Sequence, residues 1–253
     1  MSQVANHMFY ISLYAAPGDR HAIEMLATRL DTFNGLVEWR LGRGTTVPSL
    51  VIYLFNDPAT LRDAMHLRTR AGTDTFELFI NIGEPLTRCP PGLLVCQTSA
   101  GQLRQTLETV ASVCFHGTFA RGVLPFSVSA IRALFASDGW LEARHYPGTS
   151  FFLTSTDASG QHPGVPHHTE PAQAYCAMAH PPTRRGKPDY TQIIGAFGAR
   201  VGKSCNPHFA FIFRTADTYV DTLAVFPSHP APAGLPPSNR NFLESVRELT
   251  EAR

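Results

Sequence analysis

Lysine is nearly missing from this sequence: of its 21 lysine and arginine residues, only Lys187 and Lys203 are lysines. Arginine makes bidentate contacts with phosphate groups and stacks on nucleic-acid bases, which lysine does not do. The imbalance favours a protein that binds phosphate or RNA, although a GC-rich genome would produce the same bias. The formal net charge of +1 by itself decides nothing.

Long hydrophobic runs and paired cysteines are missing too. No apolar stretch approaches the ~18 residues of a membrane span, and the first residues lack the pattern of a secretory signal peptide. The five cysteines form no C-x-x-C pair, and such an odd, scattered set is typical of reduced thiols in a cytosol. We therefore expect a cytoplasmic protein with no membrane partner.

A nucleotide-hydrolysing P-loop is absent, although GARVGKSCNPHFAFIF (residues 198–213) resembles one. The glycine that a P-loop has five residues before its Gly-Lys-Ser is replaced by Phe197. An apolar strand follows the turn, where a P-loop would be followed by a long helix. The sequence argues against a P-loop hydrolase, and leaves open what else Arg200, Lys203 and Ser204 would do on a turn.

Acidic residues are scarce between positions 180 and 214, where Asp189 is the only one. The basic residues of this stretch are Arg184, Arg185, Lys187, Arg200, Lys203 and Arg214. Such a local excess predicts a phosphate-binding surface, with an ordinary solvated loop as the alternative.

The elements that are present alternate in type through residues 1–88. Apolar, β-branched runs predict strands at residues 8–14, 35–41, 49–55 and 76–82. Helices are expected after Asp19, where apolar residues recur with helical spacing from Ile23 to Leu30, and after Asp57-Pro58, a typical helix start. The order β-α-β-β-α-β predicts a ferredoxin-like unit.

The second half, residues 89–253, is harder to interpret. Strands are predicted at residues 93–99, 148–155, 208–213 and 218–226, and helices at about 101–110, 128–137 and 241–253, with Ser127 or Ser129 capping the second of these. Residues 159–188 are rich in proline, glycine and histidine and predict little regular structure. The predicted fold class is therefore α+β: an N-terminal ferredoxin-like domain (1–88) followed by a second, degenerate ferredoxin/RRM-like half.

In this order the elements resemble the CRISPR repeat-processing endoribonucleases, in particular their type I-F and type IV branches. Three stretches carry the resemblance: SLVIYLFNDPATLRDAM (49–65), FELFINIGEPLTRCPPGLLVCQTSAGQLR (76–104) and the basic turn at 198–213. It implies a metal-independent endoribonuclease that cleaves CRISPR repeat hairpins by attack of a ribose 2′-hydroxyl. It also implies that the enzyme stays bound to the stem-loop of the guide RNA, beside the other subunits of an effector complex.

Candidate site residues follow from the basic positions and from this resemblance. The predicted catalytic residues are Arg20, His21, Arg40, Lys203 and Ser204, and the predicted RNA-binding residues are Arg43, Arg184, Arg185, Lys187, Arg200, His208 and Arg240. A histidine can act as a general base, whereas arginine stabilises the phosphate charge. No cofactor or metal is expected.

Two departures from the family leave the chemistry open. At the end of the first helix, where the type I-F branch has its catalytic histidine, this sequence has Arg29 and Asp31; near the C-terminus, prolines replace a glycine-rich loop. The alternative function is a non-catalytic RNA-binding subunit, and a third is a protein-interaction domain. A zinc site using Cys176 and His180 with His162, His167 or His168 has unusual spacing. The segment CFHGTF matches the start of an ADP-ribosyltransferase site but lacks the glutamate such a site needs.

Overall fold

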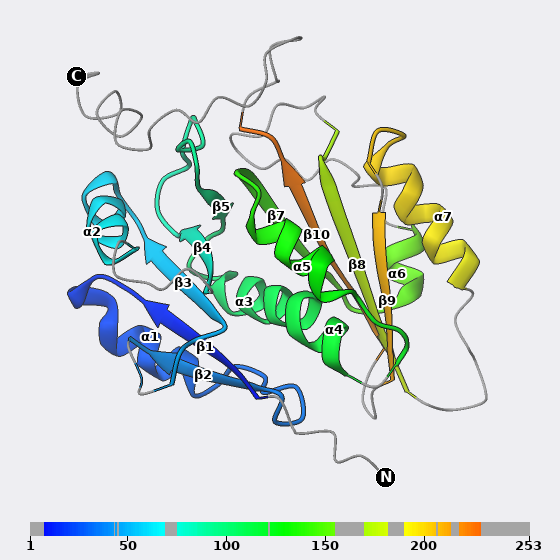
Figure 1. The fold of residues 1–253 in the computed structure, drawn as a ribbon, viewed down its shortest axis with the longest axis horizontal. Coiled ribbons are helices and arrows are strands. Elements are labelled where there is room, and N and C mark those ends of the chain that lie inside the picture. Colours follow the sequence, from blue (N-terminus) through cyan, green and yellow to red (C-terminus); the bar gives the residue numbers. More distant parts are fainter. Residues whose placement is uncertain are drawn as a thin grey trace.

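One mixed sheet runs through the whole protein (Figure 1). The structure, a computed structural model, describes residues 8–42, 44, 46–68, 75–120, 122–154, 170–181, 190–205, 207–213 and 218–228. Within them the sheet has ten strands, in the order β2 (Val37–Leu41), β1 (Phe9–Tyr14), β3 (Leu50–Phe55), β4 (Phe76–Asn81), β5 (Leu94–Gln97), β7 (Gly139–Tyr146), β10 (Tyr219–Phe226), β8 (Gln173–His180), β9 (Pro207–Phe213) and β6 (Gly122–Leu124).

The first half of the sheet is parallel, so the predicted ferredoxin-like fold is wrong. Strand β1 pairs in parallel with β2 on one side and with β3 on the other, and the parallel pairing continues through β4, β5 and β7. Residues 42–49 look like a hairpin turn in the sequence, but they carry the chain past β1, since Gly42 N–H donates to Leu13 O and Ser49 N–H to Tyr10 O. All six residues of β3 are buried, as expected for a parallel strand covered on both faces.

The predicted domain boundary lies inside this sheet. Residues 82–93 connect β4 to β5, and these two strands are hydrogen-bonded neighbours. The second half also differs from the degenerate ferredoxin/RRM-like prediction. Residues 149–154 form helix α6 and not a strand. Residues 173–180, within a region expected to lack structure, form strand β8 between β10 and β9.

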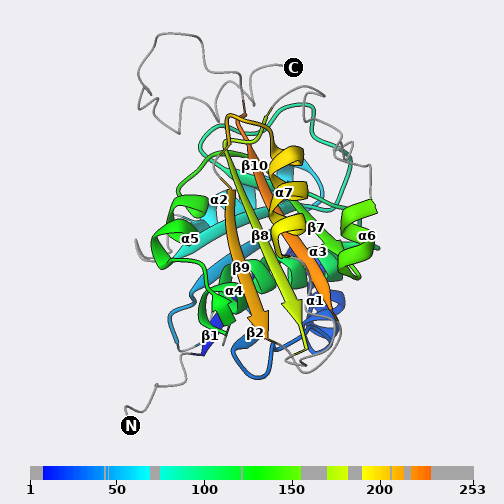
Figure 2. The same cartoon turned by 90° about the vertical axis from the view of Figure 1, so that its right-hand side faces the viewer.

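Helices cover both faces of the sheet (Figures 1 and 2). Besides the short η1 (Pro17–Asp19), they are α1 (Arg20–Ala27), α2 (Pro58–Arg68), α3 (Leu103–Ala111), the π-helical η2 (Ser112–His116), α4 (Gly117–Phe119), α5 (Val128–Phe135), α6 (Thr149–Thr154) and α7 (Tyr190–Val201). Helices α1, α3 and α5 share one large core with alternate strand residues, whereas α2 packs in a second core and α6 and α7 in a third on the opposite face. The result is a three-layer α/β architecture.

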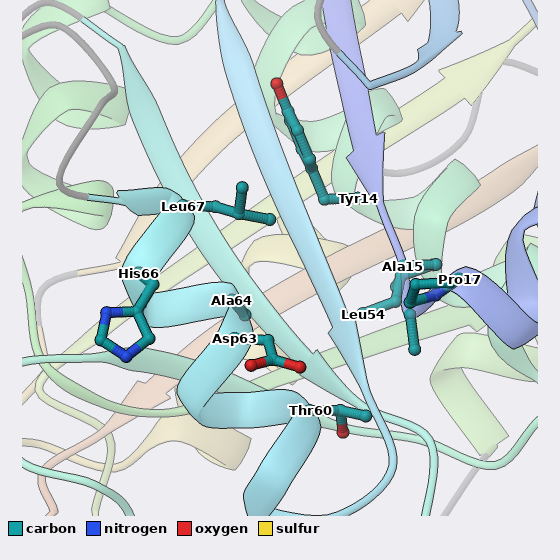
Figure 3. A pocket seen from close by; sticks show the side chains of 10 residues that line it. Tyr14, Ala15, Pro17, Leu54, Thr60, Asp63, Ala64, His66 and Leu67 are labelled. Atoms are coloured by element: carbon teal, nitrogen blue, oxygen red, sulfur yellow. The ribbon is translucent and has the colours of Figure 1, made fainter.

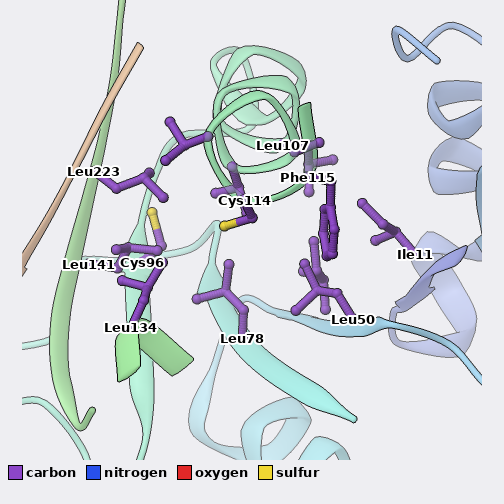
Figure 4. Packing of buried hydrophobic residues seen from close by; sticks show 14 of the residues in the cluster. Ile11, Leu50, Leu78, Cys96, Leu107, Cys114, Phe115, Leu134, Leu141 and Leu223 are labelled. Atoms are coloured by element: carbon purple, nitrogen blue, oxygen red, sulfur yellow. The ribbon is translucent and has the colours of Figure 1, made fainter. Parts of the chain in front are cut away.

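The helical run from α3 through η2 to α4 joins the two halves of the protein. Cys114 and Phe115 of this run lie between Ile11 and Leu50 of the first half and Leu141 and Leu223 of the second (Figure 4). Its flank also contacts the loop after α1, because Asp31 N–H donates to Glu108 Oε1 at 3.1 Å. This helical run is therefore the shared core of both halves.

A partly buried pair of ionisable side chains links β7 and β10 beneath that helix. His145 Nδ1 lies 2.7 Å from Asp221 Oδ1, and Asp221 is only 2% exposed. The hydrogen bond to Asp221 raises the pKa of His145 above its usual value of about 6.5. The groups facing this pair from the helix are Glu108, whose charge also raises the pKa of His145, and Ser112, which lies 3.3 Å from Tyr219 Oη.

The pair gives a pH-dependent stability with a defined sign. Because the pKa of His145 is higher in the folded state, its contribution is complete below about pH 6.5 and is lost as the pH rises through the folded value. We expect the free energy of unfolding of the wild type to exceed that of Asp221→Asn by more at pH 6 than at pH 9. Urea unfolding of both proteins at the two pH values measures this. An equal difference at both values would show that His145 does not carry the charge.

The part of the chain that the structure describes contains no helix long and apolar enough to cross a membrane. All five cysteines are buried free thiols.

Candidate functional site

The two strands at the centre of the parallel half send their following helices to opposite faces of the sheet. Strand β1 leads into α1, which packs in the core of α3 and α5, whereas β3 leads into α2 on the other face. The chain then continues from α1 to β2 on one side of β1 and from α2 to β4 on the other side of β3. This is a topological switch point, and in open α/β sheets ligands bind there, outside the carboxyl ends of the strands.

A pocket of about 310 Å³ lies at this point (Figure 3). Its walls come from the end of β1 and the turn after it (Tyr14, Ala15, Ala16, Pro17), from Leu54 of β3 and from α2 (Thr60, Asp63, Ala64, His66, Leu67). The lining is mainly apolar, and Asp63 and His66 are its only ionisable side chains besides the phenol of Tyr14. Ligand sites typically combine such an apolar wall with a few polar groups.

The start of α2 beside this pocket is held by a dense set of hydrogen bonds. Asp57 Oδ1 accepts from Ala59 N–H at 2.7 Å and from Thr60 N–H at 2.8 Å. Thr60 Oγ1 accepts in turn from the backbone N–H groups of Asn56 and Asp57, both at 3.1 Å. The Asp57-Pro58 helix start expected from the sequence is therefore confirmed. These hydrogen bonds, chiefly that from Thr60, lower the pKa of Asp57.

The neighbouring strand ends are joined by buried amides. Asn81 Nδ2 donates to Gln97 Oε1 at 2.8 Å, and Gly83 N–H donates to Asn81 Oδ1 at 3.0 Å. Gly83 lies so close to the loop after β3 that a Cβ atom there would be 1.9 Å from Asn56 O. The loop after β3, which leads into α2 beside the pocket, is thus packed against a loop after β4 that buried side chains hold in place.

The predicted catalytic residues are not brought together by the structure. Arg20 and His21 are exposed at the start of α1, whereas Lys203 and Ser204 follow α7 beside β9. Seven inter-strand spacings separate β1 from β9, which is about 30 Å. Arg40 lies on the edge strand, where its guanidinium contacts Glu38 Oε1 at 2.6 Å and lies over the ring of Tyr10.

The basic turn after α7 is already occupied by a carboxylate of the chain itself. Glu170 Oε2 accepts from Ser204 N–H at 3.1 Å, and the hydrogen bonds from Ser204 lower the pKa of Glu170. Gly202, at a φ of +82°, has no Cβ that would collide with that carboxylate. The turn therefore does favour an anion, as its composition suggested, but Glu170 supplies it.

The other predicted RNA-binding residues have structural contacts or lie outside the described residues. The guanidinium of Arg200 lies 4.0 Å from the ring centroid of Phe152 and donates to the Phe152 carbonyl. His208 stacks on Tyr175 at a centroid distance of 4.9 Å. The positions that lie outside the described residues are Arg43, Arg184, Arg185, Lys187 and Arg240.

The two alternative sites considered in the sequence find no support in the described part of the chain. His180 Nε2 lies 2.7 Å from Tyr190 Oη and its Nδ1 lies 2.7 Å from Pro181 O, while burial raises the pKa of the Cys176 thiol. No cluster of three or more potential metal ligands occurs among the described residues; His162, His167 and His168 lie outside them. In CFHGTF, His116 is buried in η2.

A ferredoxin-like unit has no switch point, so that prediction places no site at the ends of β1 and β3. The useful signal is the uninterrupted run of apolar residues at 50–55, which is typical of a parallel strand with helices on both faces. With a parallel sheet assumed, the turns after residues 14 and 55 would have become the first candidates for a site.

Comparison with known proteins identifies the architecture. No family model matches the chain, and no curated protein sequence matches it either. Solved structures do match: CetZ1 from Haloferax volcanii, a GDP-bound monomer, has a TM-score of 0.55 and 9% identity, with 96% of this chain and 98% of that chain covered. The fold is tubulin/FtsZ-like.

Two further structures agree with this assignment. CetZ2 from Haloferax volcanii, a GTPγS-bound protofilament, gives a TM-score of 0.51 at 11% identity, covering 96% of this chain and 98% of that chain. TubZ from Clostridium botulinum phage c-st gives 0.50 at 8% identity, covering 96% of each chain. The resemblance to CRISPR endoribonucleases is therefore wrong, and with it the predicted RNA cleavage, the RNA-binding alternative, and the guide-RNA and effector-complex partners.

Proposed function

We propose that the protein binds a purine nucleoside moiety in the pocket between the end of β1 and α2. The observation that carries the proposal is the position of this pocket at the switch point of a parallel sheet, where α/β folds of this kind bind nucleotides. CetZ1, which shares the fold, is described as GDP-bound. The cytoplasm is the proposed compartment, consistent with five free thiols.

The lining favours a flat, partly apolar ligand with hydrogen-bond donors. Tyr14 and the alanine-proline turn after it offer an apolar wall, and the carboxylate of Asp63 offers only acceptors. Guanine carries two adjacent N–H donors that a carboxylate can accept together, whereas adenine carries one amino group there. We therefore expect guanosine to bind more tightly than adenosine. A volume of about 310 Å³ is at the lower end of ligand sites, as suits a nucleoside.

Replacing Asp63 with alanine tests this arrangement. Loss of a hydrogen bond to a charged acceptor should weaken guanosine binding by about tenfold, measured by isothermal titration calorimetry. Both Asp63 and its neighbour Arg62 are exposed on α2, but only Asp63 lines the pocket, so Arg62→Ala is the matched control and should leave the affinity unchanged. The proposal fails if the wild type binds neither nucleosides nor nucleotides, or if both variants bind as the wild type does.

A further inference from the structure

Phosphate groups are usually bound in α/β folds by free backbone N–H groups at the start of a helix after a switch-point strand. Helix α2 has none to offer in its first turn. Pro58 has no N–H, the N–H groups of Ala59 and Thr60 are bonded to Asp57 Oδ1, and that of Leu61 donates to Asp57 O at 3.0 Å.

The loop before α2 is closed in the same way. The N–H groups of Asn56 and Asp57 both donate to Thr60 Oγ1. Gly83 packs against Asn56 from the other side, so the peptide groups of this loop have no room to rotate. Thr60 also lines the pocket, so these hydrogen-bonded N–H groups lie beside the part of the pocket where the phosphate of a nucleotide would be placed.

At the start of α1, on the other side of the pocket, Pro17, Asp19 and Arg20 likewise offer no free N–H group. Pro17 has no N–H, Asp19 N–H donates to Ala16 O at 3.0 Å, and Arg20 N–H donates to Pro17 O. The charges beside the pocket are also unfavourable to phosphate. Asp57 is exposed at the start of α2 and Asp63 lies on the pocket wall. Arg62, a cation that acts on Asp57, is exposed on the same helix, and no arginine or lysine is part of the pocket wall.

From this geometry we propose that Asp57 excludes phosphate from the switch point, so that the pocket selects a nucleoside over the corresponding nucleotides. The inference rests on the proposed nucleoside binding and names the residue that sets its specificity. The carboxylate takes the position and the hydrogen bonds that a phosphate would use, and its charge repels a phosphate placed beside it.

Titration of guanosine, GMP, GDP and GTP into the wild type and Asp57→Asn tests the inference. Asparagine caps a helix as well as aspartate does, so the substitution removes the charge and keeps the fold. We expect the wild type to bind guanosine at least tenfold more tightly than GDP, and Asp57→Asn to reduce this ratio by about fivefold while guanosine affinity stays constant. Asp138→Asn, in the loop before β7, controls for a general change of charge.

The salt dependence of GDP binding to the wild type gives a second readout that needs no variant. Repulsion by Asp57 predicts that GDP affinity rises as salt screens the charges, whereas an ordinary phosphate site would lose affinity. The inference is overturned if GDP binds as tightly as guanosine, with or without magnesium, or if Asp57→Asn leaves the ratio unchanged. If guanosine and the nucleotides all fail to bind, the proposed function itself is wrong and this inference falls with it.

Discussion

Replacing Phe115 with alanine is expected to lower the free energy of unfolding by about 4 kcal/mol, the largest effect of any substitution considered. Phe115 is 2% exposed and lies in the core that contains residues from both halves of the sheet (Figure 4). Its ring also stacks on Phe9 of β1 at a centroid distance of 4.8 Å. Removing it leaves a cavity under the helix that joins the two halves, and the rigid strands around it cannot collapse to fill the space.

Phe119 provides the matched control, because its ring contacts the same Phe9 at 4.3 Å but is 40% exposed. Phe119→Ala should cost only about 1 kcal/mol, since most of the area it loses was already in contact with water. Urea unfolding, followed by circular dichroism, measures both variants. If the two substitutions cost the same, the helical run from α3 to α4 is not the shared core of the protein.

Replacing Gly83 with alanine is expected to cost about 3 kcal/mol and to disturb the site directly. The added Cβ would lie 1.9 Å from Asn56 O and 2.8 Å from Asn56 Cα, and both are backbone atoms that cannot rotate away. The loop after β3 would have to move, which would separate Asn56 from Thr60 at the start of α2. Guanosine affinity should therefore fall together with stability.

Gly101→Ala separates this contact from a general effect of losing a glycine. Gly101 lies in the turn before α3, and nothing approaches within 4 Å of the position of its Cβ. Alanine there should be neutral or slightly stabilising, because it reduces the freedom of the unfolded chain. A thermal unfolding series of both variants gives the comparison. Equal stability of Gly83→Ala and Gly101→Ala would mean that the loop after β3 is not held against Gly83.

Local sequence signals predict several elements correctly. The apolar runs placed β1, β3 and β4 within one residue at each end, and the Asp57-Pro58 pair placed the start of α2. Ser127, one of two candidate caps, does accept from Ala130 N–H at 3.1 Å. These features depend on neighbouring residues alone, which is why a single sequence suffices for them.

Local sequence signals do not predict how those elements are arranged in space. Residues 42–49 have the composition of a hairpin turn, and only the pairing of β2 and β3 on either side of β1 shows that they form a crossover. Residues 149–154 combine aromatic and β-branched residues that favour a strand, but Phe152 is buried against Phe197 of α7 as part of a helix. Long-range packing decided both cases.

The candidate site was missed for the same reason. Clustered basic residues point to the turn at Lys203 and Ser204. That turn does hold an anion, but the anion is the side chain of Glu170, 34 residues earlier in the sequence. The switch-point pocket has no arginine or lysine in its wall, so charge could not have revealed it. Only the order of the strands shows that helices α1 and α2, which follow β1 and β3, lie on opposite faces of the sheet.

Mapping the guanosine site by amide chemical shifts tests the central claim most directly. In ¹⁵N-labelled protein, guanosine is predicted to shift the amide signals of the residues around the pocket, above all Tyr14, Ala15, Thr60, Asp63 and Ala64. The turn after α7, about 30 Å across the sheet, should be unaffected. Shifts centred on Lys203 and Ser204, or no shifts at saturating guanosine, would contradict the assignment of the switch-point pocket as a nucleoside site.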